Sequence, residues 1–183
     1  MQAACEKLKQ DMLKTLGIAR TIEIGVTDEH VATYAAWVEY GWEQRVTPKQ
    51  QYFFARKGVS IVPKAGGSLS NPARPFFRET IATHSPTWQK IFLNYLRVYG
   101  YGSIIDALTL VGNEAKADFQ ETIANGRVIG GKVFERRRPL TLEMYAMETN
   151  GHKTDGSGSL ETDQPLKKTG DLFNSIGWRF KVM

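Results

Sequence analysis

The chain has 183 residues, 42% of them hydrophobic and 11% aromatic, with a formal net charge of +5. This length suits one domain that buries roughly 70% of its unfolded surface, and the modest charge permits contact with nucleic acid or an acidic partner without requiring either. A lone cysteine, Cys5, excludes an intrachain disulfide, and no apolar run approaches the roughly 20 residues that a membrane span needs.

The first elements alternate between helix and strand patterns. An amphipathic helix is predicted over 5–16, and a half-buried strand over 21–26. A further helix is predicted over 28–41, begun by an N-cap aspartate and ended by Gly41. Glu39 lies off the centre of that helix's apolar stripe, so we interpret it as a solvated carboxylate at the rim.

The next segment reads as a capped helix followed by a turn. Thr47-Pro48 is an N-cap and N1 pair, and it predicts a helix over 49–57 that stops at a glycine. Residues 59–61 alternate as a short strand, and 64–68 read as a hairpin turn.

The stretch Asn71–Arg78 is a proline corner. Pro72 and Pro75 fix their own φ and extend the residues before them, which predicts a stiff segment without ladder bonds of its own. Pro75 suits the first position of a helix, so the corner should seat a helix and deliver Phe76 and Phe77 into the core.

Helical patterns dominate the middle of the chain. A short helix is predicted over 76–83, and Ser85-Pro86 should cap another. The spacing of Ser103 and Asp106 matches a capping box, and it opens an apolar stripe over 104–125 that predicts the longest helix.

The last third begins with a basic segment and ends in a strand. The run Arg136, Arg137 and Arg138 is a candidate contact for DNA or for a protein partner. A helix is predicted over 141–147, a mobile loop over 150–164, and a strand over 176–182 that pairs with the strand at 21–26. The predicted class is α+β, with a small, mostly antiparallel sheet, several helices and one long helix in a single domain over 1–183.

No catalytic, cofactor or metal site is predicted. The segment Gly126–Lys132 has P-loop spacing, but a helix precedes it and Val133 follows it, so we interpret the spacing as coincidence. The three histidines are widely separated and only one cysteine exists, so no tetrahedral zinc set is visible.

Three stretches, in this order, carry a resemblance: Tyr34–Gly41, Asn71–Arg78 and Pro165–Ile176. Together they resemble the tail-completion (minor tail component) proteins of long-tailed bacteriophages and the related virion-morphogenesis proteins. That family shows a Tyr-Ala…Glu-Phe/Tyr-Gly helix end, a Pro-Ala-Arg-Pro-Phe corner and a closing Thr-Gly-x-Leu-x-x-Ser-Ile segment.

The resemblance implies a non-enzymatic subunit of a ring at the head–tail junction of the virion, assembled in the host cytoplasm. Its partners would be further copies of itself (six or twelve by analogy), the tail terminator and the head-connector or portal-adaptor proteins, around a channel that passes DNA. The residues implied to serve assembly or structure are Glu39, Gly41, Pro72, Arg74, Pro75, Phe76, Thr169, Gly170, Ser175 and Ile176. Thr169 and Gly170 would form the turn that sets the register of the last strand.

Two other function classes stay open on the residues alone. The alternative is a small basic nucleic-acid-binding protein, whose affinity should fall steeply with salt. A nucleotide-dependent enzyme that uses Lys132 would show nucleotide binding that Lys132→Ala abolishes.

Overall fold

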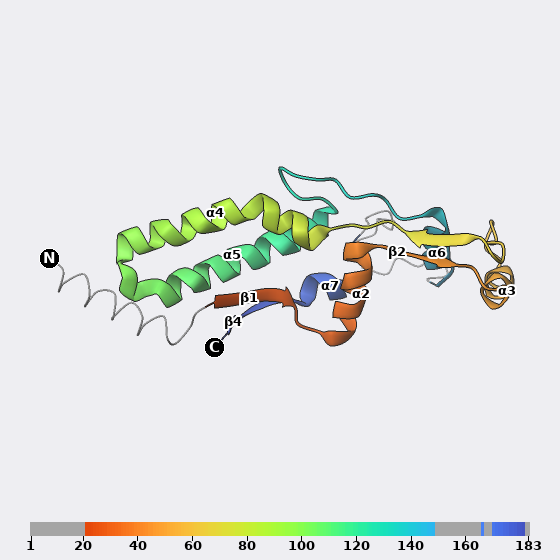
Figure 1. Ribbon diagram of the computed structural model, residues 1–183, viewed down its shortest axis with the longest axis horizontal. Coiled ribbons are helices and arrows are strands. Elements are labelled where there is room, and N and C mark those ends of the chain that lie inside the picture. Colours follow the sequence, from red (N-terminus) through yellow and green to blue (C-terminus); the bar gives the residue numbers. More distant parts are fainter. Residues whose placement is uncertain (1–20, 149–165, 167–169, 182–183) are drawn as a thin grey trace.

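The structure, a computed structural model, describes residues 21–148, 166 and 170–181 (Figure 1). The helix predicted over 5–16, the loop predicted over 150–164 and Thr169 lie outside the described residues. The described part is α+β, as predicted, with two small antiparallel sheets among the helices. Figure 1 shows an elongated molecule with a helical hairpin at one end and a thin β-arm at the other.

The helical hairpin is made of α4 (Phe76–Tyr99) and α5 (Ile104–Asn125), joined by the short 3-10 turn η1 (Tyr101–Ser103). Residues of α5 at helical spacing are buried against α4 and the nearby sheet, and Phe119 lies at the centre with no exposed surface. Phe77 stacks on Phe119 with ring centroids 4.5 Å apart. The proline corner therefore delivers its aromatic pair into the core, as predicted.

The prediction of two separate helices around Ser85-Pro86 was wrong. Pro86 lies inside α4, which is continuous and, at 24 residues, longer than the 22-residue α5. The proline is exposed, so its missing hydrogen bond falls on the solvent side, while the opposite face of α4 packs along α5. Tertiary packing thus outweighs the local signal, and Ser85 caps nothing.

Ser103 does not form the predicted capping box. Its hydroxyl donates to the carbonyl oxygen of Gly100 over 2.7 Å, which closes η1 instead of satisfying the first turn of α5.

The sheet under α5 has the predicted pairing. β1 (Thr21–Val26) runs antiparallel to β4 (Ile176–Lys181), with Ile22 opposite Phe180 and Val26 opposite Ile176. Trp178 of β4 packs so closely on α5 that a Cβ at Gly112 would lie 2.5 Å from its ring.

The arm, residues 42–71, is built from β2 (Trp42–Arg45), α3 (Pro48–Lys57) and β3 (Ser68–Asn71). Thr47 and Gln50 form a capping box at the start of α3, as the Thr-Pro signal predicted. The prediction of a strand over 59–61 was wrong: the strand that pairs with β2 is β3, and it includes Asn71. The turn predicted at 64–68 is present, with the Gly67 amide donating to the Lys64 carbonyl over 3.0 Å.

The remaining helices are α2 (Glu29–Tyr40), α6 (Pro139–Glu148) and α7 (Asp171–Asn174). α7 was not predicted, and it stands between Gly170 and the last strand. Gly170 has a φ of 83° and begins α7, so it does not set the strand register directly. None of the described helices combines the length and the apolar composition required to cross a bilayer.

Candidate functional site

Arg74 is the centre of the proline corner. Its side chain is 2% exposed, and its guanidinium donates to the carbonyl oxygens of Glu135 at 2.7 Å and Arg136 at 3.0 Å and to the Asn71 side chain at 3.0 Å. The Arg74 amide also donates to the Val38 carbonyl over 2.8 Å. One buried cation therefore ties the end of α2, the corner and the strap at 135–136 together.

Glu39 is the second anchor of the corner, and the interpretation of it as a rim carboxylate was wrong. It is buried, and its carboxylate accepts from the amides of Phe77 at 2.9 Å and Arg78 at 3.2 Å, which caps the first turn of α4. The Arg78 guanidinium donates to the same carboxylate over 2.8 Å, and this pairing raises the pKa of Arg78. Glu39 is 38 residues from Phe77, so no local pattern could reveal the cap.

Gly41 allows the corner to approach α2. Its φ is 69°, in the region that favours glycine, and a Cβ there would lie 2.7 Å from the Ala73 nitrogen. The corner residues named by the resemblance therefore act together as a rigid joint between α2 and α4.

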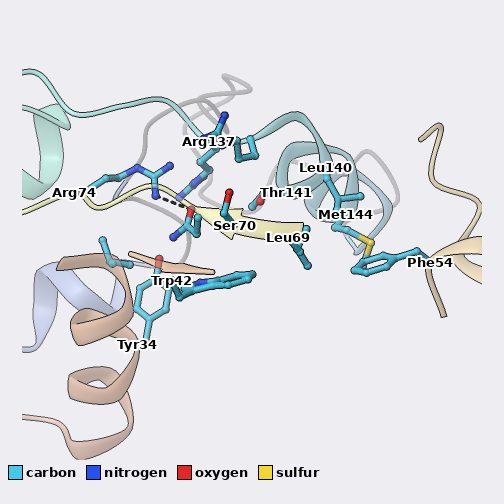
Figure 2. A pocket seen from close by; sticks show the side chains of 13 residues that line it. Tyr34, Trp42, Phe54, Leu69, Ser70, Arg74, Arg137, Leu140, Thr141 and Met144 are labelled. Carbon is cyan, nitrogen blue, oxygen red and sulfur yellow. Dashed lines mark hydrogen bonds between the residues drawn. The ribbon is translucent and has the colours of Figure 1, made fainter. Parts of the chain in front are cut away.

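A groove of about 330 Å³ opens beside this joint (Figure 2). Arg74 and Arg137 lie at one end, and Figure 2 shows Met144 of α6 and Phe54 of α3 pointing toward each other at the other end. Apolar side chains from α2, β2, β3 and α6 line the space between. They are Tyr34, Val38, Trp42, Leu69 and Leu140.

The arginine run does not act as one exposed patch. Arg137 is buried at the groove, whereas Arg136 and Arg138 are exposed, and Arg138 pairs with Glu135 over 3.4 Å. The backbone carbonyls of Glu135 and Arg136 accept hydrogen bonds from Arg74. The run predicted for DNA or partner contact thus offers two exposed guanidinium groups, not three.

Ser175 and Ile176, the last two residues of the resemblance, lie in the core. Ile176 is 1% exposed, and the buried Ser175 hydroxyl donates to the Leu172 carbonyl over 3.0 Å. Thr27 donates in turn to the Ser175 carbonyl, both from its amide and from its hydroxyl. These residues join β1 to β4 and are apart from the groove.

One side of α3 forms an exposed surface that the sequence did not predict, since α3 has no buried residue. Its inward positions are Gln50, Gln51 and Phe54, and Gln51 accepts from the Ala65 amide over 2.9 Å. The outward side, which we call the α3 face, carries aromatic and basic side chains that are all exposed. The α3 face consists of Lys49, Tyr52, Phe53, Arg56 and Lys57.

Elsewhere in the described residues, polar side chains make contacts between elements. The imidazole of His84 lies 3.4 Å from the Asp118 carboxylate, which also accepts from the Trp88 indole at 2.6 Å, a contact that ties α4 to α5. The P-loop-like segment follows α5 and closes with an isolated bridge between Arg127 and Val133. Among the described residues, no group of three His, Cys, Asp or Glu side chains could hold a metal ion.

Comparison of the chain with known protein families, with curated proteins and with solved structures finds no match.

Proposed function

We propose that this chain is a structural subunit of a tailed-phage virion, forming a ring at the head–tail junction that joins the tail terminator to the head connector around the DNA channel. The observation that carries the proposal is α3, a ten-residue helix at the end of the arm that buries none of its residues. Tyr52 is 64% exposed and Phe53 is 46% exposed, although aromatic side chains are a main source of binding energy when an interface buries them.

The joint at Arg74 supports the same function. A ring subunit has to present one surface to its neighbour in a fixed direction, since each interface is repeated around the ring. The bonds of Arg74 and Glu39 hold the base of the arm against α2 and α4, so the arm projects from a rigid base. The three stretches of the sequence resemblance include both residues.

Quantitative mass spectrometry of purified phage particles tests the proposal, with this chain counted against the portal protein. We expect about six or twelve copies per particle, by analogy with the symmetry of tails and connectors. Hundreds of copies would indicate a tube or shell protein, and absence from mature particles would contradict a permanent neck subunit.

Nucleic-acid binding is the second candidate, and the charge of the arm favours it. Residues 42–71 contain five exposed basic side chains and one acidic one, Glu43. Such a protein should bind a DNA duplex with an affinity that falls steeply as salt rises. Weak binding with little salt dependence would leave the ring proposal as the better explanation.

A further inference from the structure

The α3 face is patterned as two basic-aromatic rows. Lys49, Phe53 and Lys57 follow one another at intervals of four residues, and Tyr52 and Arg56 form the neighbouring row. Lys57 lies 5.8 Å from the centroid of the Phe53 ring, and Arg56 lies 5.9 Å from that of Tyr52. Each exposed ring is therefore accompanied by a cation.

The arm concentrates the charge of the whole molecule. Residues 42–71 hold five basic residues against one acidic residue, Glu43, which gives +4 of the net charge of +5 of the entire chain. All five are exposed, including Arg45 and Lys64 beside α3. The rest of the chain has a net charge of only +1, so the arm is the part that attracts an acidic surface.

An acidic surface with a related pattern runs along α5. Its exposed stripe, which we call the α5 face, lies opposite the buried side of that helix and contains no basic residue. Within the described part of the chain, no ion pair engages its acidic groups. The α5 face consists of Asp106, Leu110, Glu114, Ala117 and Glu121.

The two faces match in spacing as well as in charge. Lys49, Phe53 and Lys57 place a ring midway between two cations, and Asp106, Leu110 and Glu114 place a leucine midway between two carboxylates. Both sets extend over eight residue-to-residue steps, or about 12 Å of helix. Leu110 is 41% exposed, so Phe53 has an apolar surface to cover when the charges pair.

We propose that the α3 face of one copy of this chain docks on the α5 face of the next copy. Figure 1 places α3 at the end of the molecule opposite the turn that joins α4 to α5, where α5 begins, so the two faces of one chain do not meet. Contact between unlike faces is head-to-tail, and it generates a ring where the rotation closes. The inference rests on the proposed ring function and names the contact that builds the ring.

A charge-reversal series tests the contact, with association of the purified full chain followed by sedimentation velocity. Lys49→Glu/Lys57→Glu and Asp106→Lys/Glu114→Lys should each weaken self-association by roughly tenfold or more, since each turns two attractive pairs repulsive. Mixing the two variants, or combining the four substitutions in one chain, should restore association. Lys90→Glu/Lys132→Glu reverses two exposed charges elsewhere and should change nothing.

Asp106 lies in the first turn of α5, where a lysine also opposes the helix dipole. Glu114→Lys/Glu121→Lys reverses the same face farther along the helix and should weaken association as well. Loss of association without rescue in the mixture, or no loss at all, would overturn the contact. The contact would also be overturned if Lys49→Glu/Lys57→Glu lost binding to duplex DNA while its self-association stayed unchanged. That result would make the α3 face a nucleic-acid-binding surface.

Cysteine cross-linking extends the test to weak association. In a Cys5→Ser background, Phe53→Cys on one copy and Leu110→Cys on another should give a mixed dimer under a short thiol cross-linker. Leu93→Cys, on the exposed side of α4, replaces Leu110→Cys as the matched control and should give none. If both tests fail while mass spectrometry gives the copy number expected at the neck, the contact is wrong and the proposed function is not contradicted.

Discussion

Arg74 is the residue on which the joint between arm and body depends, because it donates to several acceptors from inside the protein. Arg74→Met keeps the length of the side chain but leaves buried carbonyls without donors, which should cost about 3 kcal/mol or more of unfolding free energy. Arg74→Lys should lose less unfolding free energy than Arg74→Met but should not reach the stability of the unchanged protein, since an ammonium lacks the planar fork of a guanidinium. Urea unfolding measures both, and exposed Arg45→Met is the control; equal losses at 45 and 74 would contradict this role.

Gly41 and Gly58 both have a positive φ, but Gly58 is left-handed with a ψ of 27°, whereas Gly41 has a ψ of 177°, a region essentially restricted to glycine. Their φ values are 69° and 75°, so alanine is strained at both, but only at Gly41 does a Cβ meet the backbone of the corner. Gly58→Ala should lose about 1 kcal/mol, the ordinary cost of this conformation, and Gly41→Ala clearly more. Thermal unfolding of the two variants checks the order; similar melting temperatures would mean that the corner moves away without penalty.

Glu23 makes the β1–β4 sheet sensitive to acid. Lys181 and Arg179 lower the pKa of its carboxyl below the ordinary 4.5, so the carboxylate stabilises the folded state above that value. This contribution is lost as pH falls through the lowered pKa. An NMR titration should show the lowered pKa, and Lys181→Met should raise it toward the ordinary value; an unchanged pKa in that variant would reject the pairing.

At the scale of elements, the sequence predicts what local chemistry decides. The Thr47 capping box begins α3 within one residue of its predicted start, and the alternation at 176–181 predicts β4 and its partner β1. The burial of Glu39 and the position of Pro86 inside a helix could not be predicted, because both depend on contacts between α4 and segments that are distant in the sequence. The α3 face was not predicted for the opposite reason. Aromatic residues usually predict burial, but Tyr52 and Phe53 are exposed, while two glutamines share the inward side of α3 with Phe54.

Pro86 carries a prediction for α4 as an element. The ring removes the hydrogen bond to the Ala82 carbonyl on an exposed face, so Pro86→Ala should restore it and stabilise the protein by about 2 kcal/mol. Thr87→Ala, exposed at the next position, should gain less than about 0.7 kcal/mol. Chemical denaturation compares the two; a less stable Pro86→Ala would show that α4 needs the proline's geometry to follow α5.

At the scale of the whole molecule, stability and exposed interaction surface are separated. The hairpin of α4 and α5 with the β1–β4 sheet contains the buried core around Phe119 and Ile123, whereas α3 contributes no buried residue. The charge is divided in the same way, since the basic excess lies on the arm. A partner that bound the arm would add to the stability of the arm.

This division predicts how the molecule opens. Amides of α5 near Phe119 should exchange with solvent only on global unfolding, whereas those of α3 near Phe53 should exchange through local opening at a free energy several kcal/mol lower.

Self-association should protect the amides of α3 and of the α5 face together, and the reversal Lys49→Glu/Lys57→Glu should remove the added protection at both. Hydrogen exchange with mass spectrometry, at concentrations below and above association, measures this. Amides of α2 near Val38, anchored by the joint, are the internal control and should not change. If α3 is as protected as α5 in the monomer, the arm is part of the cooperative core and the separation proposed for this molecule is wrong.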